Sequence, residues 1–126
     1  MTTRKPAKRS KGVTFDDVAA IGTRLPGVET SKSYGTAALK VDGKFMARLK
    51  EDGETLVVRM DIVSRDLVLK AQPKIFFITD HYRDYPTVLV RLSEVKRDQL
   101  GELLEDAWRL VASKKRIGER EEGEGG

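Results

Sequence analysis

The sequence predicts an α+β domain, in which helices pack on one antiparallel sheet and the elements run α-β-β-β-α-β-β-α along the chain. Three observations predict it. The 126 residues are enough for a single core. Strand-like runs follow one another through tight turns, which implies antiparallel pairing. Helical stretches with one apolar face occur near the start, in the middle and near the end, so that helices and strands are not regularly alternated.

The first helix is predicted over about residues 14–24. The Thr14 hydroxyl can cap its first turn, and Asp17 stands where the acid of a capping box belongs. Pro26-Gly27 ends the helix. Its apolar face follows three- and four-residue spacing through Phe15, Val18, Ala19 and Gly22, with Leu25 beyond.

Three strand-like runs come next, at residues 30–40, 44–50 and 55–60, and the first is broken near Gly35. A shorter helix follows. Ser64 is its predicted cap, Asp66 lies in its first turn and Pro73 stops it. Its apolar residues are Leu67, Val68 and Ala71.

Two late strands and a long helix complete the domain. The strands are predicted at residues 75–78 and 87–92. The helix is predicted over about residues 98–113, with Trp108 at the edge of its apolar stripe. That stripe consists of Leu100, Leu103, Leu104, Ala107 and Val111.

The turn at Asp42-Gly43 decides the register of the first predicted hairpin. A two-residue loop would place Lys40 opposite Phe45 and mix charge with core on both faces. A three-residue loop that includes Val41 removes this conflict, and we therefore predict it, with Leu39 opposite Phe45 and Ala37 opposite Ala47 on the inner face. The next turn pairs Leu49 with Leu56 inside and Arg48 with Val57 outside. The outer face then carries a row of cations, here called the basic stripe: Lys40, Lys44, Arg48, Lys50 and Arg59.

The basic stripe has two interpretations. Like charges that face each other repel, so a phosphate backbone lying across them would explain the cluster. Alternatively, the stripe is an ordinary solvated face whose long side chains cover apolar surface, and the nearby acids Glu51, Asp52 and Glu54 neutralise it. No aromatic residue is interleaved in the stripe to stack on bases.

Composition excludes several classes of protein. There is no cysteine, which rules out a disulfide scaffold, a thiolate zinc site and a cysteine nucleophile. With His81 as the single histidine, a zinc site built on histidines is not expected, and no cofactor is expected either. No window approaches the roughly 18 apolar residues of a membrane helix. We therefore expect a cytoplasmic protein without membrane contact.

Charge is distributed unevenly along the chain. Residues 1–12 hold five cations and no acid, here called the N-terminal arm: Arg4, Lys5, Lys8, Arg9 and Lys11. The last fourteen residues hold four cations and four acids, so the +4 of the whole chain leaves −1 for residues 13–112. Residues 1–12 have Met1 as their one large apolar side chain, and residues 118–126 have none. We therefore predict disordered tails at 1–12 and 117–126 around a single domain at 13–116. The arm could hold phosphates or be a solvated end.

The segment 79–86, between the two late strands, is dense in polar and aromatic side chains. Its residues His81, Tyr82, Arg83 and Tyr85 could form a polar pocket in which Asp80 or Asp84 orients the histidine. Alternatively, the tyrosines plug the end of the sheet, Arg83 pairs with a neighbouring aspartate and the histidine is a loop residue. No partner nucleophile, phosphate loop or dinucleotide motif is present, so an enzyme is not expected.

Several stretches together resemble the MmcQ/YjbR-like family of small bacterial proteins. They are Leu25-Pro26-Gly27-Val28-Glu29, the run from Ser33 to Leu49 around Gly43-Lys44-Phe45, Thr79-Asp80-His81-Tyr82, and the run from Leu103 to Leu110. The resemblance spans roughly residues 14–112. It implies an α+β fold likened to type III secretion chaperones, and DNA binding through a double-wing arrangement of the sheet. The family often has a tryptophan before its late strand, where this chain has Tyr85-Pro86.

The resemblance and the basic stripe together predict a DNA-binding protein with little or no sequence specificity. Its stripe and N-terminal arm would contact the phosphates of double-stranded DNA. The alternative is a protein-interaction or chaperone-like adaptor that binds a partner or a second copy of itself, since a fold does not dictate a function. Dependence on salt separates the two, because phosphate binding weakens steeply with ionic strength and an apolar interface does not.

Overall fold

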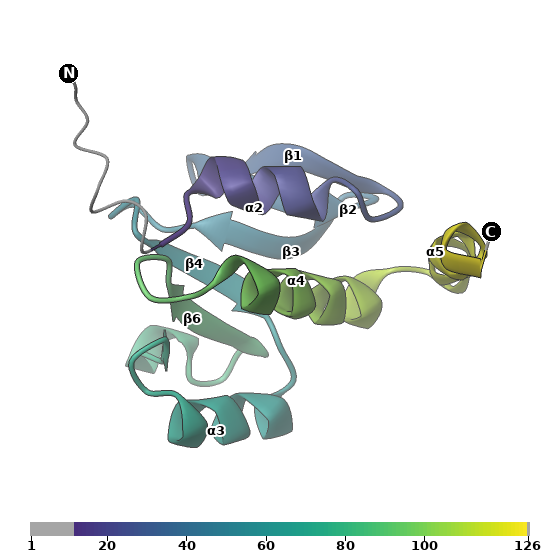
Figure 1. Cartoon of the computed structure of the whole chain (residues 1–126). Helices are drawn as coiled ribbons and strands as arrows, with labels where there is room; N and C mark the ends of the chain where they lie inside the picture. The colour runs from purple at the N-terminus through teal and green to yellow at the C-terminus, as the bar shows by residue number, and fades with distance from the viewer. Residues whose placement is uncertain (1–11, 126) are drawn as a thin grey trace.

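A computed structural model describes residues 12–125, with side chains up to residue 122. Its centre is a six-stranded antiparallel sheet in the order β1-β2-β3-β4-β6-β5 (Figure 1). Helices α2 (Phe15–Gly22) and α4 (Arg97–Val111) pack on one face of this sheet, and the main core lies between them and the strands. We call the opposite face the outer face. The predicted α+β class is confirmed.

The first helix begins as predicted. Thr14 is the N-cap of α2, and the capping box with Asp17 is complete in both directions. Gly22 leaves room for the Leu39 side chain on the strand below, because Leu39 Cδ1 would lie 2.4 Å from a Cβ at this position. A larger residue here would require Leu39 to shift.

The predicted first strand is in fact two. β1 (Val28–Ser33) and β2 (Thr36–Val41) form a hairpin through Tyr34 and Gly35, which both have positive φ. The element order is therefore one strand longer than predicted. Two consecutive residues in the left-handed region are typical of a tight I′ turn. From the sequence alone, Gly35 could equally mark such a turn or a bend within a single strand.

The predicted register between β2 and β3 (Lys44–Leu49) is wrong. The loop has two residues, Asp42 and Gly43, so Lys40 does pair with Phe45. The chain resolves the conflict with a β-bulge in β3, where Met46 is the additional residue and faces the core together with Ala47. The bulge reverses the alternation, which turns Phe45 to the outer face rather than the inner.

The other strand pairings follow the prediction more closely. β3 pairs with β4 (Thr55–Arg59) with Leu49 opposite Leu56 and Arg48 opposite Val57, as predicted. β6 (Thr87–Arg91) lies between β4 and β5, and β5 is a strand of only two residues, Phe76–Phe77. The segment 79–86 thus connects the edge strand β5 to β6, which lies beside β4.

Helix α3 (Ile62–Ala71) is capped by Asp61 and not by Ser64. The Asp61 carboxylate accepts hydrogen bonds from the Ser64 amide and hydroxyl, so the helix starts earlier than predicted. The predicted apolar face is also incorrect in part. Leu67 is exposed, whereas Arg65 is buried.

The long helix largely follows the prediction, whereas the C-terminal residues do not. The stripe of α4 packs on the core as predicted, but Trp108 is fully buried rather than at the edge, and its Nε1 donates to the Pro26 carbonyl at 2.8 Å. Residues 117–125 were predicted to be disordered, yet they belong to α5 (Lys114–Gly125). Tertiary contacts explain this, because Ile117 packs on the core and Arg120 pairs with Glu105. The predicted tail at 1–12 lies outside the described residues except for Gly12.

No helix in the described part of the chain has the length and apolar character needed to cross a membrane.

An ion pair between Arg116 and Asp42 should hold α5 against the β2–β3 turn. Arg116 donates two hydrogen bonds to the Asp42 carboxylate, which lower the pKa of that carboxyl, so the attachment is present at neutral pH and is lost as pH falls through the lowered pKa. We expect Asp42→Asn, which keeps a residue suited to the left-handed turn, to speed amide exchange in α5 while β2 and β3 keep their protection. Unchanged exchange in α5 would show that this ion pair does not hold the helix.

Candidate functional site

The outer face carries a groove with a volume of about 570 Å³. Its walls are the β1–β2 turn on one side and the segment 79–86 on the other, and strands β3, β4 and β6 form its floor. It joins residues of the basic stripe to residues of the predicted polar pocket, two regions that the sequence analysis treated as separate. The side chains that shape the site are Tyr34, Phe45, Arg48, Arg59, His81, Tyr82, Tyr85 and Thr87.

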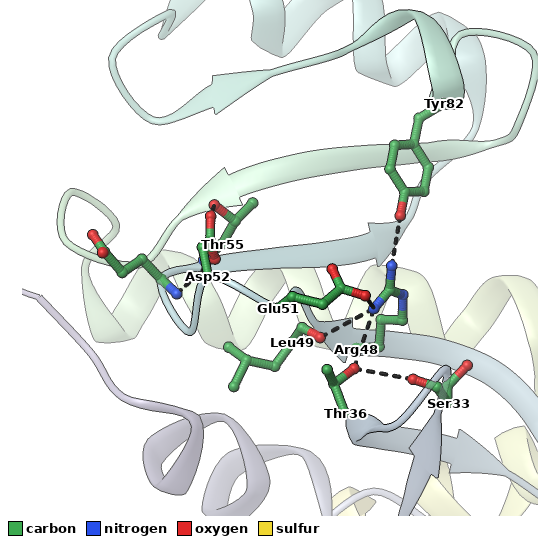
Figure 2. Close-up of polar contacts among 9 residues, drawn as sticks. Ser33, Thr36, Arg48, Leu49, Glu51, Asp52, Thr55 and Tyr82 are labelled. Carbon is green, nitrogen blue, oxygen red and sulfur yellow. Dashed lines mark hydrogen bonds and ion pairs between the residues drawn. The ribbon is translucent and has the colours of Figure 1, made fainter.

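Arg48 lies at the floor of this groove and is engaged by the protein itself (Figure 2). Its Nη2 donates to the Tyr82 hydroxyl at 2.8 Å, and its Nη1 donates to Thr36 Oγ1 at 3.1 Å. Glu51 completes the set with a carboxylate oxygen 3.6 Å from Nη1. These bonds connect β2, β3 and the segment 79–86 through Arg48. The Arg48 side chain is only 8% exposed. It is not the exposed phosphate contact that the sequence predicted.

Glu51 remains ionised beside Arg48. A hydrogen bond from its own backbone amide lowers the pKa of the Glu51 carboxyl, and the charges of Arg48 and Lys50 lower it further. The charged Glu51 carboxylate therefore offsets the charge of Arg48 at this end of the groove. No described carboxylate pairs with Arg59, the other arginine of the groove.

Arg59 and Thr87 form a neighbouring pair on β4 and β6. Both line the groove. Within residues 12–122, no side chain or backbone group forms an ion pair or hydrogen bond with the Arg59 guanidinium. The Thr87 hydroxyl is buried and has no hydrogen-bond partner among the described residues. The floor thus presents one unengaged cation beside one unengaged hydroxyl.

The rest of the basic stripe does not form a continuous surface. Lys44 pairs with the core residue Val41, so it lies on the helix side of the sheet and not on the outer face as predicted. Lys40 is on the outer face, where Glu29 of β1 is its cross-strand neighbour. Lys50 is also on that face, with its ammonium 5.5 Å from the centre of the Tyr82 ring.

The segment 79–86 contributes aromatic rings rather than a catalytic pair. His81 contacts the ring of Tyr82 at 4.7 Å between centroids and that of Tyr85 at 6.2 Å. Asp80 pairs with Arg83, which does not line the groove, and no described residue forms a hydrogen bond with the imidazole. The expected orientation of His81 by an aspartate is therefore not found. No described cluster of three or more acids and histidines could hold a metal ion.

Four aromatic side chains line the groove, although no aromatic residue stands in the stripe itself. Phe45 reaches the outer face through the bulge, and Tyr82 and Tyr85 come from the connecting segment. Tyr34 comes from the β1–β2 turn, where the Arg48 guanidinium lies 5.1 Å from its ring centre. The Tyr34-Gly35 pair is the sequence feature that could have indicated a turn with an exposed tyrosine. The prediction of a single strand over residues 30–40 did not include this turn.

Arg65 is a positioning residue that was not predicted from the sequence. It is buried on α3, and its guanidinium donates to four backbone carbonyls at 2.9–3.3 Å. The acceptors are carbonyls of the segment 79–86 and of the first residue of β6: Tyr82, Arg83, Tyr85 and Thr87. The guanidinium thus holds one wall of the groove in place, as a fork of donors can.

The sequence model of the YjbR family matches residues 23–110, which is more than half of the chain and includes most of the groove. The chain belongs to the YjbR family. Among solved structures, a Deinococcus radiodurans protein with a DUF419 domain has a similar fold, with a TM-score of 0.69 and 24% identity over 84% of this chain and 86% of that one. The resemblance stated from the sequence is thereby confirmed.

Curated relatives of this YjbR protein match over a shorter stretch. Uncharacterized proteins of Mycobacterium bovis and Mycobacterium tuberculosis are 41% identical to it over 46 residues. That stretch is 36% of this chain and 36% of each relative. The similarity thus covers about a third of the length of these relatives.

Removing the Arg65 guanidinium should destabilise the YjbR domain by about 2–4 kcal/mol, because buried carbonyls lose their donors. We expect this for Arg65→Met, measured by urea unfolding. Arg91→Met is the matched control. Arg91 also donates to two carbonyls, of Pro73 and Lys74, but at an exposed site where water can replace it, so its removal should destabilise by less than about 1 kcal/mol. Equal destabilisation in the two variants would contradict the role given to Arg65.

Proposed function

We propose that this YjbR protein binds DNA through the outer face of its sheet, with little or no sequence specificity. The observation that carries the proposal is the arrangement of the groove, in which the unengaged Arg59 lies on a floor bordered by exposed tyrosines. Cations that track a backbone and aromatic rings that accept bases are the two parts of a nucleic-acid surface. Phosphate contacts set position and carry no base information, which is consistent with low specificity.

The cations that we assign to phosphates are fewer than the stripe predicted. Arg59 and Lys50 are accessible on the outer face, and Lys40 lies farther along it beside Glu29. Arg48 supports the surface from beneath. With a net charge of −1 over residues 13–112, the domain alone would bind DNA weakly.

The N-terminal arm is proposed to supply most of the electrostatic attraction. Its residues before Gly12 lie outside the described part of the chain. Gly12 itself lies against Ser93 and lines a second hollow with Gly53 and Glu54 of the β3–β4 turn. The arm therefore joins the domain at the end of the sheet near Lys50, from which it can reach DNA bound to the outer face.

The second candidate function is a protein-interaction adaptor, and the observation that favours it is the surface of α3. Ile62, Val63 and Leu67 are exposed on this helix. Exposed apolar side chains that cluster on one element are typical of interaction surfaces. Neither candidate function includes a catalytic step.

Charge reversal at Lys50, which follows β3, and at Lys44, its first residue, should separate binding by the outer face from general electrostatic attraction. Lys50→Glu should weaken binding of a labelled duplex and lower the slope of log K against log salt by about 1, since one phosphate is no longer neutralised. Lys44→Glu makes the same change of charge on the helix side of the sheet and should have a much smaller effect. Fluorescence anisotropy at several salt concentrations measures both. Equal effects of the two variants would refute binding by the outer face.

Removing residues 1–12 should lower both the affinity for DNA and its salt slope, the slope falling by about 1 for each phosphate that the arm neutralises. The difference between Lys50→Glu and Lys44→Glu should persist in the shortened chain. If that difference disappears with the arm, the outer face does not bind DNA on its own. If the affinity is unchanged, the arm has no part in binding.

A further inference from the structure

We infer that the groove accepts a single unstacked nucleotide, with its base against the tyrosine rings and its phosphate on Arg59. This inference rests on the proposed function and deepens it. It predicts that the protein distinguishes an unpaired nucleotide, whether in a strand or free, from one within a duplex. Three independent features of the groove support it.

The first feature is a hydroxyl without a partner. Thr87 is 6% exposed, lines the groove, and its Oγ1 forms no hydrogen bond with any described residue. Buried polar groups are paired in the great majority of cases, so an unpaired one requires an explanation. A polar group of a ligand seated on the floor of the groove would supply the missing hydrogen bond.

The second feature is the contrast between the two arginines of the floor. Arg48 is surrounded by Tyr82, Thr36 and Glu51, which use its donors. Arg59 is engaged by no other described residue and stands directly beside Thr87 across the β4–β6 pair. An arginine fork matches the oxygens of a phosphate, and such charge-assisted bonds are stronger than neutral ones. The unengaged arginine and the unengaged hydroxyl therefore mark one anion-binding end of the groove.

The third feature is Tyr34, which occupies a place unsuited to it. Its φ is +54°, and its side chain is 85% exposed. The left-handed conformation is unfavourable for an ordinary residue, and the first position of such a turn favours Asn, Asp or Gly. The equivalent turn after β2 has Asp42 at φ +50°. The ring lies 5.1 Å from the Arg48 guanidinium, yet the residue stays 85% exposed, so most of the ring is left for contact with a ligand.

The ligand chemistry follows from these features together. Tyr34 and Tyr85, which is 55% exposed, offer aromatic faces at the rim of the groove. A planar ring with an attached anion satisfies both ends of the site, and a volume of about 570 Å³ lies within the usual range for small-ligand sites. Bases within a duplex are already stacked on one another, so only an unpaired nucleotide can use these rings.

The test compares a short oligothymidylate, thymidine monophosphate and a duplex of mixed sequence, each titrated into the full chain by calorimetry. We expect the oligothymidylate to bind more tightly than the duplex. Tyr34→Asn should weaken its binding about tenfold, as expected when a base can no longer stack on the ring. Thr87→Val should weaken it about fivefold, as expected when one hydrogen bond is removed. Thr30→Val, on the exposed edge strand β1, is the matched control and should have no effect.

Urea unfolding of the same variants excludes a loss of fold as the cause. Tyr34→Asn relieves an unfavourable backbone conformation, and Thr87→Val removes an unsatisfied hydroxyl, so both should be at least as stable as the parent protein. A variant that is stable and yet binds the oligothymidylate less well supports the site.

The outcomes separate this inference from the proposed function. If the duplex binds as well as the oligothymidylate and neither variant weakens either, DNA binding stands and the nucleotide site is refuted. If no nucleic acid binds, both are refuted. If thymidine monophosphate binds as tightly as the oligothymidylate, and Tyr34→Asn and Thr87→Val weaken its binding, the site is supported. Its ligand is then a free nucleotide rather than one within a strand.

Discussion

The bulge in β3 determines which residues reach the outer face. A single additional residue, Met46, lets two neighbours face the core and reverses the alternation of the strand before them. Phe45 is thereby placed at the groove and Lys44 is turned to the helix side. Without this irregularity, the two-residue Asp-Gly turn would place Arg48 on the core side of the sheet and turn Ala47 and Leu49 to the outer face. The composition of the groove depends on it.

Three arginines around the groove differ in how far the protein itself uses their hydrogen-bond donors. Arg48 and Arg65 are buried, and backbone carbonyls or side-chain oxygens use their donors. They hold the strands and the segment 79–86 in a fixed relation. Arg59 is without such contacts within the described chain. The protein itself uses most of the donors of the two buried arginines, so Arg59 is the arginine whose donors are left for a ligand.

Membership of the YjbR family and the geometry of the groove bear on function in different ways. The family match places the fold, and the similar structure from Deinococcus radiodurans agrees with it. Neither assigns a ligand. The proposal of nucleic-acid binding rests on the outer face itself, where aromatic rings from three parts of the chain line the same groove as Arg59. It also depends on the charge of the arm, since the domain alone is nearly neutral.

The sequence by itself determined the elements whose signals are local. The Thr14 capping box, the stripe of α4 and the β3–β4 register all depend on residues close together in the chain, and each was predicted correctly. Only the tertiary structure decided the faces of β3, the burial of Arg48 and the attachment of α5 to Asp42. The last two depend on partners 34 and 74 residues away, and no local pattern encodes such a meeting.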